Sequence, residues 1–283
     1  GASLDIQEEA RTKDADLVVA VTSSDETNIL ACLVAKRLGA KSTIARVRNP
    51  EYLRQTEIMK EDLGLTMIVN PEQETADEIV NLIDLPSLLK VEHFARGKVM
   101  LVEILVEENS KLIDETLITL AKKINTKFLI CAVQRGNEVI IPNGNFKIEK
   151  GDRISVTADT QLIAELLKEM NLISEPLKNI LIIGGGKIAY YLAKTLISKK
   201  YKVKLIENNE ERAVELAESL PKATIICGDG TDHDLLVEEG IETTDSCIAL
   251  TNIDEENIII SMYAKKLKLP KVIAKIKRSS FLG

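Results

Sequence analysis

The chain has no tryptophan, and aromatic residues make up only 3% of its 283 positions. Its two histidines, His93 and His233, lie far apart, and neither has the spacing of a metal ligand. The cysteines stand singly in apolar runs, without a CxxC pair, at Cys32, Cys131, Cys227 and Cys247. This pattern is typical of buried thiols in a reducing compartment, so we expect neither a disulfide framework nor a metal site.

A basic charge excess and a long hydrophobic run are also missing. The formal net charge is −7 and the sequence pI is about 5.2, which argues against nucleic acid as the main partner because phosphate-tracking surfaces are normally basic. No apolar run approaches the ~20 residues of a membrane span, and no basic-then-apolar leader begins the chain. We therefore expect a soluble globular chain, which could still dock on a membrane protein.

Strand and helix patterns alternate from Leu17 to Ile83 and again from Ile180 to the end, which predicts parallel sheets. Between them, residues 98–171 have a different rhythm, with a helix expected from Asp114 to Ile124 and hairpin turns at RGNE and IPNGNF. Closely spaced strands joined by such turns indicate a small α+β module. The overall fold class is therefore α/β, with two parallel-sheet units flanking that module.

The two parallel-sheet units are related by an internal repeat. Aligning Asp16–Arg46 with Asp245–Lys275 at a constant offset of 229 gives twelve identities in 31 positions without a gap. Subtracting 229 from Gly184 gives a position upstream of Gly1, so the glycine loop of the first copy is expected outside the chain. The pattern predicts a fragment that begins inside one unit and ends inside the next; a divergent lone βα unit at the start is the alternative.

The stretch ILIIGGGKIAYYLAKTL predicts a strand, a glycine loop and a helix. Gly184, Gly186 and Ala189 occupy the G-x-G-x-x-G/A positions, at which glycines allow a tight turn and close approach of a pyrophosphate. The helix that starts near Lys187 would direct its N–H groups at the phosphates. Glu207, 21 positions beyond Gly186, is placed to accept hydrogen bonds from ribose hydroxyls and to repel a 2′-phosphate, which favours NAD over NADP.

Other polar residues follow the expected strands of this unit. Asp229 ends the third strand and could face the adenine, although Gly-Asp-Gly is also ordinary turn chemistry. Thr251 and Asn252 end the fourth strand, at the edge where open parallel sheets bind ligands. Lys187 and Lys275 are candidate phosphate cations or plain surface charges. The clustered acids of NIDEEN could suggest a metal site, but they also open a helix, and stabilisation by the helix dipole is the favoured explanation.

The middle module offers no catalytic equipment. Residues 98–171 contain no histidine and no tyrosine, and candidate acids such as Asp114, Glu115 and Glu149 lie at a helix start and a turn. A dehydrogenase needs a proton donor or acceptor against the nicotinamide. A repeated nucleotide unit without such a group indicates a non-enzymatic switch, and an NAD-dependent oxidoreductase is the alternative.

Five stretches together resemble a known family: HFARGKV (93–99), GGGKIA, KLIENNEERA, GDGTDHDLL and ALTNIDEEN. In this order they resemble the TrkA family, the cytoplasmic regulatory subunits of Trk-type potassium uptake systems, built from domains also called RCK or KTN. The resemblance covers essentially the whole chain. It implies three parts: the C-terminal part of a first Rossmann-like unit at 1–90, a small α+β RCK_C (TrkA_C) domain at 91–175, and a second, NAD-binding Rossmann-like unit at 176–283 that lacks its C-terminal end.

The resemblance also implies a function. Members of the family are expected to bind NAD(H), and also ATP or ADP, and to gate a TrkH-like integral membrane potassium channel subunit. They are expected to form a tetrameric ring beneath it, as cytoplasmic proteins peripheral on the inner face of the cell membrane. Carried over by position, the ligand contacts fall on Gly184, Gly185, Gly186, Lys187, Ile188, Glu207, Thr251, Asn252 and Lys275. The first copy retains only Thr22, Ser23 and Arg46.

Overall fold

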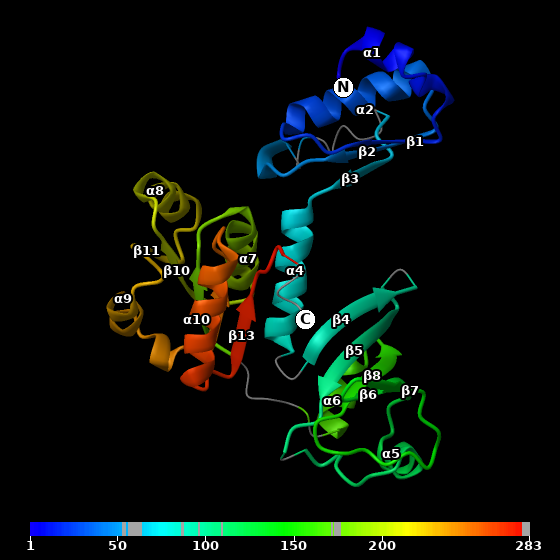
Figure 1. Cartoon of the computed structure of the whole chain (residues 1–283), viewed down its shortest axis with the longest axis vertical. Helices are drawn as coiled ribbons and strands as arrows, with labels where there is room; N and C mark the ends of the chain where they lie inside the picture. The colour runs from blue at the N-terminus through cyan, green and yellow to red at the C-terminus, as the bar shows by residue number, and fades with distance from the viewer. Residues whose placement is uncertain are drawn as a thin grey trace. The chain divides into compact units, whose positions relative to one another are not determined.

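The computed structural model describes residues 1–52, 55, 64–85, 88–95, 97–108, 110–170, 172 and 177–278 (Figure 1). These residues form two compact units. One unit comprises Gly1–Asp77 with Lys187–Leu192, and the other comprises Glu78–Gly186 with Ala193–Gly283. Within them lie two parallel sheets and one antiparallel sheet.

The first segment contains a three-stranded parallel sheet in the order β1-β2-β3. Its elements are α1 (Leu4–Glu9), η1 (Thr12–Asp14), β1 (Leu17–Ala20), α2 (Asp25–Leu38), β2 (Ser42–Arg46), β3 (Met67–Val69) and α4 (Pro71–Asp84). Helix α2 begins where the Ser24 side chain accepts a hydrogen bond from the N–H of Thr27, and it ends at Gly39, whose φ of +115° favours glycine. Its buried face packs Cys32 against a core that includes Ala45, Val47 and Leu65.

The middle segment is a five-stranded antiparallel sheet in the order β4-β5-β8-β6-β7, with two short helices. Its elements are β4 (Leu88–Phe94), β5 (Val99–Leu105), α5 (Leu117–Lys123), β6 (Phe128–Arg135), β7 (Glu138–Ile140), β8 (Arg153–Asp159) and α6 (Ile163–Glu169). The helix expected from Asp114 begins at Leu117, because Asp114 has a left-handed φ of +68°. Thr116 then caps the helix by accepting from the N–H of Thr119. The α+β character of this module is confirmed.

The third segment is a five-stranded parallel sheet in the order β11-β10-β9-β12-β13. Its elements are β9 (Asn179–Ile183), α7 (Lys187–Ser198), β10 (Lys202–Glu207), α8 (Glu210–Ser219), β11 (Thr224–Cys227), α9 (His233–Glu238), η2 (Ile241–Thr243), β12 (Ser246–Ala249), α10 (Asp254–Lys266) and β13 (Lys271–Ala274). Numbered along this segment, the strand order is 3-2-1-4-5, that of a Rossmann fold. The α/β fold class with two Rossmann-like sheets is confirmed.

Strand β9 is the centre of this sheet, and both of its faces are buried. Ile180, Leu181, Ile182 and Ile183 are each at most 2% exposed. Strands are added on one side of β9 up to β11 and on its other side from β12, so the strand order reverses between the parallel neighbours β9 and β12, and the loops after these two strands diverge at the carboxyl edge of the sheet. Such a switch point is where open α/β sheets bind ligands.

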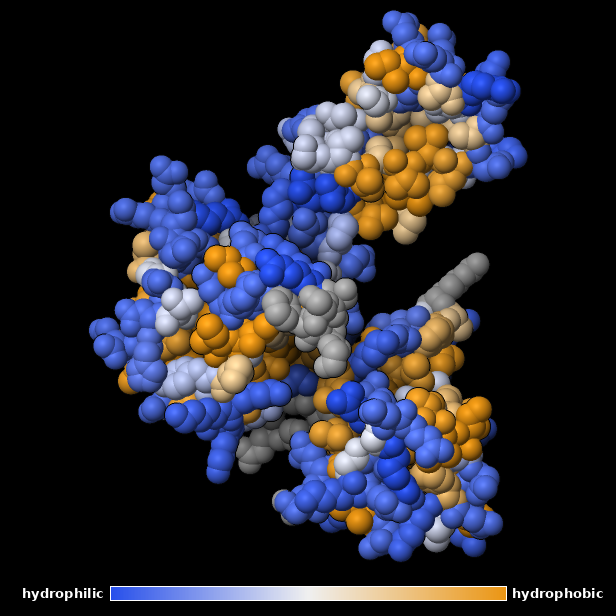
Figure 2. Space-filling model, in the orientation of Figure 1, coloured by the Kyte–Doolittle hydropathy of each residue, from blue (hydrophilic) through white to orange (hydrophobic). Residues whose placement is uncertain are grey.

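The first segment carries exposed apolar side chains, and Figure 2 shows hydrophobic residues gathered on one side of it. Among them, Leu17, Val19 and Val21 of β1 and its following loop are about half exposed. Among the described residues β1 pairs with β2 alone, whereas its repeat counterpart β12 pairs with both β9 and β13 and buries Ile248 completely. In the described parts of the chain, no helix is long and apolar enough to cross a membrane.

Candidate nucleotide site

The glycine loop joins β9 to α7 in a conformation that the sequence alone can specify. Gly184 has a φ of +98°, and a Cβ on it would lie 2.9 Å from the backbone C and O of Leu250 and the N of Thr251. Only glycine fits there, because a side chain would meet backbone atoms that cannot rotate away. Gly186, by contrast, has ordinary backbone angles, and a Cβ on it would meet nothing within 4 Å.

Helix α7 begins at Lys187, as expected, with Gly186 as its N-cap and no side chain capping it. The N–H groups of its first turn therefore lack a helical partner, and together with the helix dipole they form an anion-binding end. Open space beside Gly186 lies next to these groups. This arrangement can hold a phosphate or pyrophosphate against the backbone.

Glu207 lies at the end of β10 and reaches the glycine loop. Its Oε2 accepts a hydrogen bond from the N–H of Gly185 at 2.6 Å, and its Oε1 accepts from the N–H of Asn209 at 2.8 Å. Arg212 donates from Nε to the carbonyl oxygen of Gly185 at 3.0 Å. A carboxylate has about four lone-pair sites, so Glu207 keeps acceptor capacity for ribose hydroxyls while it holds the loop.

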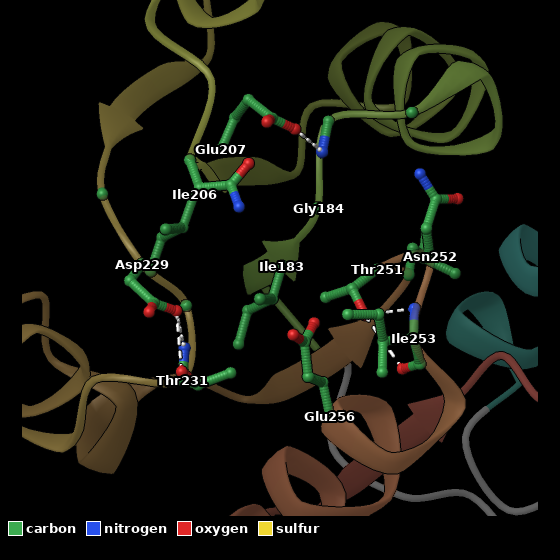
Figure 3. A pocket seen from close by; sticks show the side chains of 16 residues that line it. Ile183, Gly184, Ile206, Glu207, Asp229, Thr231, Thr251, Asn252, Ile253 and Glu256 are labelled. Carbon is green, nitrogen blue, oxygen red and sulfur yellow. Dashed lines mark hydrogen bonds between the residues drawn. The ribbon is translucent and has the colours of Figure 1, made fainter.

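A cavity of about 210 Å³ opens at the carboxyl ends of β9, β10, β11 and β12 (Figure 3). Seven of the residues predicted from the sequence line it: Gly184, Gly185, Gly186, Glu207, Asp229, Thr251 and Asn252. The side chains of Ile183 and Ile206 supply an apolar floor beneath them. The cavity thus combines an apolar surface, a phosphate cradle and carboxylates.

Asp229 forms a tight turn at the β11 side of this cavity. Its Oδ1 accepts from the N–H of Thr231 at 2.8 Å and from the Thr231 hydroxyl at 2.7 Å. These two hydrogen bonds, the backbone one first, hold the pKa of Asp229 below its usual value. Asp229 therefore remains a charged acceptor at neutral pH.

Three predicted residues of the third segment lie outside the cavity lining: Lys187, Ile188 and Lys275. Lys187 is exposed on the first turn of α7. Lys275 is half-buried and donates from Nζ to the carbonyl oxygen of Leu250 at 3.1 Å, and burial lowers its pKa. In this structure its ammonium group faces β12, so a phosphate contact by Lys275 stays a prediction.

The first copy of the repeat arranges its equivalent residues in a similar way. Arg46 donates from Nη2 to the carbonyl oxygen of Thr22 at 2.8 Å, while Thr22 itself donates its N–H to Asn28. The Ser23 carbonyl accepts from the guanidinium of Arg48. These contacts hold the loop after β1, and ligand binding by Thr22, Ser23 and Arg46 stays a prediction.

Sequence reasoning missed Glu256, which lines the cavity from the first turn of α10. The acid run that contains it was considered as a metal site or as a helix start, and not as part of a nucleotide site. Thr231, Gly230 and Ile253 also line the cavity without having been singled out. The repeat contained a signal for Glu256. This residue aligns with Thr27 of the first copy, so the acid is a difference between the copies and not part of the sequence that they share.

These features define a class. A parallel sheet in Rossmann order, a glycine loop at its switch point and an acid at the end of the second strand are those of nucleotide-binding α/β domains. The chain belongs to the TrkA family, as its motifs indicated. The TrkA-N domain matches residues 1–71 and 180–282, and the TrkA-C domain matches residues 101–171.

Curated relatives agree with this assignment. The chain is 37% identical to the Trk system potassium uptake protein TrkA of Vibrio alginolyticus, over 98% of this chain and 61% of that protein. It is 34% identical to a TrkA homolog of Archaeoglobus fulgidus, over 99% of this chain and 64% of the relative. The chain therefore spans less than two thirds of the length of these relatives.

Solved structures share the fold at low sequence identity. The GsuK RCK domain matches with a TM-score of 0.65 at 19% identity, covering 96% of this chain and 57% of that chain. The GsuK channel bound to NAD matches with a TM-score of 0.65 at 20% identity, covering 94% of this chain and 46% of that chain. GsuK bound to ADP matches with a TM-score of 0.53 at 15% identity, covering 96% of this chain and 46% of that chain. At these identities the likeness establishes the fold alone.

Proposed function

We propose that this chain is part of a regulatory subunit that senses NAD(H), and ATP or ADP, and controls a TrkH-like potassium channel in the membrane. The nucleotide binds in the cavity of the third segment, and the chain acts without turning the nucleotide over. The family's small module and repeated sheet assemble into a tetrameric ring at the cytoplasmic face of the membrane. The three-part division at 1–90, 91–175 and 176–283 belongs to this proposal.

The observation that carries the proposal is the contrast between Gly184 and Gly186. Gly184 is required by the protein's own backbone, since a Cβ there would collide with Leu250. Gly186 is not required by any packing contact, because a Cβ there would stand in open space. Gly186 lies at the N-terminus of a helix, and packing within the protein does not require a glycine there. A ligand that approaches the backbone at this point explains why the residue is a glycine.

The choice of ligand follows from Glu207 and Asp229. A carboxylate at the end of β10 accepts from ribose hydroxyls and repels a 2′-phosphate, which favours NAD(H) over its phosphorylated form. Two GsuK structures of this fold, one bound to NAD and one bound to ADP, support both ligand classes. ATP and ADP share the adenosine phosphate portion of NAD(H), so the same cradle accommodates them.

The membrane partner is supported by the relatives' names, which place those relatives in Trk potassium uptake systems. A cytoplasmic sensor in such a system has to act on the membrane subunit that conducts potassium. Among the described residues, no group of three or more His, Cys, Asp or Glu side chains could hold a catalytic metal. The cavity itself offers acceptors and a phosphate cradle, which suffice for binding.

Calorimetric titration of the chain and of Gly186→Ala with NADH, NAD, ADP and ATP tests the ligand assignment. We expect the unmodified chain to bind and Gly186→Ala to lose at least tenfold in affinity while melting like the unmodified protein. Equal affinity in the two proteins would show that no phosphate lies against Gly186. Absence of binding by the unmodified chain would overturn the proposal.

Two further measurements separate a regulator from an oxidoreductase. NADH absorbance should stay constant in the presence of the chain and a panel of carbonyl substrates, and substrate-dependent consumption would establish an enzyme instead. Potassium flux through vesicles that contain a TrkH-like subunit should change when the nucleotide-loaded protein is added. A potassium flux that is the same with and without the protein, whichever nucleotide is present, would contradict the gating role.

A further inference from the structure

Glu256 is an acid of the cavity that the protein's own contacts leave unused. It is half-buried in the first turn of α10 and lines the cavity. Figure 3 shows its carboxylate pointing from the helix toward Ile183. The Glu256 carboxylate forms no hydrogen bond or ion pair with any of the described residues.

The neighbouring acids of the same helix turn behave differently. Glu255 pairs with Arg278 at 2.9 Å outside the cavity. Asp254 is buried and accepts hydrogen bonds from the N–H groups of Lys277 and Arg278, at 3.1 and 3.0 Å. The helix dipole stabilises all three acids of this turn, so it does not distinguish them. Glu256 differs from the other two because its side chain points to the place where a ligand would lie.

The position of the base in this cavity follows from the two contacts that the proposed function assigns. The phosphates lie at the N-terminus of α7, and the ribose hydroxyls lie at Glu207. In a nucleotide the base and the 5′-phosphate are carried by different carbons of the ribose, C1′ and C4′, on either side of the ring oxygen, so in an extended nucleotide they point away from each other. The base therefore extends away from the glycine loop, over Ile183 and Ile206, with Thr231 on the β11 side and Glu256 on the α10 side.

We infer that Glu256 recognises the adenine base by accepting a hydrogen bond from its 6-amino group, which makes Glu256 the base-specificity residue of this site. The inference rests on the proposed function, in which every ligand carries adenine. An ionised carboxylate can only accept hydrogen bonds. The ring nitrogens of adenine are acceptors and its 6-amino group is its only donor, so no other pairing of this base with Glu256 is attractive.

Asp229 cannot replace Glu256 in this role through Oδ1, because that oxygen already accepts two hydrogen bonds from Thr231. Hypoxanthine has an oxo group in place of the 6-amino group. Its oxygen would face the Glu256 carboxylate as a second acceptor and repel it, and the only donor on that edge is the N1–H, one ring atom away from the position at which the carboxylate meets the 6-amino group. A site that pairs with the amino group should thus discriminate strongly against inosine nucleotides.

Titration calorimetry with ADP and inosine diphosphate tests the inference on the full chain. We expect the unmodified protein to prefer ADP by about tenfold or more, since a lost hydrogen bond to a charged group has at least this effect. In Glu256→Gln the amide can donate to an oxo group, so the ratio should fall to within about twofold. The ratio isolates the base contact, because removal of a negative charge changes the affinity for both diphosphates alike.

Glu255→Gln is the matched control, since it removes a charge from the same helix turn outside the cavity, and its preference should equal that of the unmodified protein. NAD and nicotinamide hypoxanthine dinucleotide give a second, independent ratio. An unchanged ADP preference in Glu256→Gln overturns the inference and leaves the proposed function standing. If the unmodified chain binds neither diphosphate nor dinucleotide, the proposed function fails and the inference fails with it.

Discussion

Asn28 and Asn257, 229 residues apart, make the same three hydrogen bonds in the two copies of the repeat. Each is fully buried. Asn28 accepts from the N–H of Thr22 and donates to the carbonyl oxygens of Thr22 and Arg46, at 2.7, 3.1 and 2.9 Å. Asn257 makes the corresponding bonds to Thr251 and Lys275, at 2.9, 3.2 and 2.9 Å. One amide thus joins the ends of two neighbouring strands in each copy.

Asp25 and Asp254 repeat a second contact at the same offset. Asp25 accepts from the N–H groups of Arg48 and Asn49, both at 2.8 Å, and Asp254 accepts from the N–H groups that follow β13. Both carboxylates are buried at the start of a helix. The shared sequence therefore encodes a fixed carboxyl edge of the sheet, and this edge carries the cavity in the third segment.

Asn257→Ala should weaken the third segment alone. The change leaves the N–H and C=O of Thr251 and the C=O of Lys275 without their partner, at a cost of about 2–3 kcal/mol. Hydrogen exchange followed by mass spectrometry should show faster exchange in β12 and β13 and unchanged exchange in β1 and β2. Asn28→Ala should give the reverse pattern.

Asn137→Ala, at an exposed hairpin turn of the middle module, controls for the substitution itself and should leave exchange in both sheets unchanged. Equal acceleration in both copies by either buried-Asn variant would contradict a local role for the amide.

The third segment could be predicted well because each of its signals is local. The strand ILII is apolar on both faces, Gly184 is forced by its left-handed φ, and α7 begins where the loop ends. The repeat extended the prediction to the first segment, where no glycine loop is present to mark the fold. These features depend on neighbouring residues in the chain, which a sequence displays directly.

The remaining features of the site depend on the direction in which a side chain points, and a sequence does not display this direction. Glu256 and Glu255 are adjacent acids, and only the phase of α10 sends one into the cavity and the other to Arg278. Lys275 was a candidate phosphate cation or a plain surface charge, and nothing in the sequence indicates that its ammonium group would donate to the carbonyl of Leu250. Asp114 was expected to open a helix, and its left-handed backbone instead ends the preceding turn.

Gly184→Ala and Gly186→Ala should differ sharply in stability. At Gly184 the added methyl group meets the backbone of Leu250 and must adopt a left-handed φ, which alone costs about 1–2 kcal/mol. We expect the third segment to lose about 3 kcal/mol or more in urea unfolding. Gly186→Ala should remain within about 0.5 kcal/mol of the unmodified protein. Equal losses would show that the loop is not built as described.

The thiols should react with iodoacetamide in order of exposure. Cys227 is exposed at the end of β11, whereas Cys32 and Cys247 are fully buried. Burial raises the pKa of Cys247 to about 12 and also raises that of Cys32, so neither forms the reactive thiolate at pH 8. Peptide mass spectrometry should find Cys227 labelled first and the buried pair labelled only in urea. Fast labelling of Cys247 in the folded protein would contradict its position in the core.

The middle module contains an ion pair between the buried Asp152 and the partly exposed Arg135, and its effect on stability should depend on pH. Asp152 is fully buried and accepts from Nε and Nη2 of Arg135, both at 2.8 Å, and from the N–H of Glu149 at 2.8 Å. Burial alone would raise the pKa of Asp152, but the hydrogen bonds from Arg135 and Glu149 outweigh it and lower the pKa below the unfolded value. The carboxylate therefore contributes stability above about pH 4, and this contribution is lost as the pH falls through the folded pKa.

Asp152→Asn should consequently lower the stability of the module by about 1–2 kcal/mol at pH 7, because it removes the charged acceptor from Arg135, which is partly exposed and keeps its ion pair with Glu149. The difference from the unmodified protein should shrink as the pH falls below about 4, since protonation then neutralises the native carboxylate as well. Urea unfolding at pH 7, 5 and 3, followed through exchange of β6 and β8 amides, measures this gap. Glu149→Gln removes the exposed partner of Arg135 and should cost less than about 1 kcal/mol at every pH. A gap for Asp152→Asn that stays constant from pH 7 to 3 would show that the lowered pKa of Asp152 does not stabilise the fold.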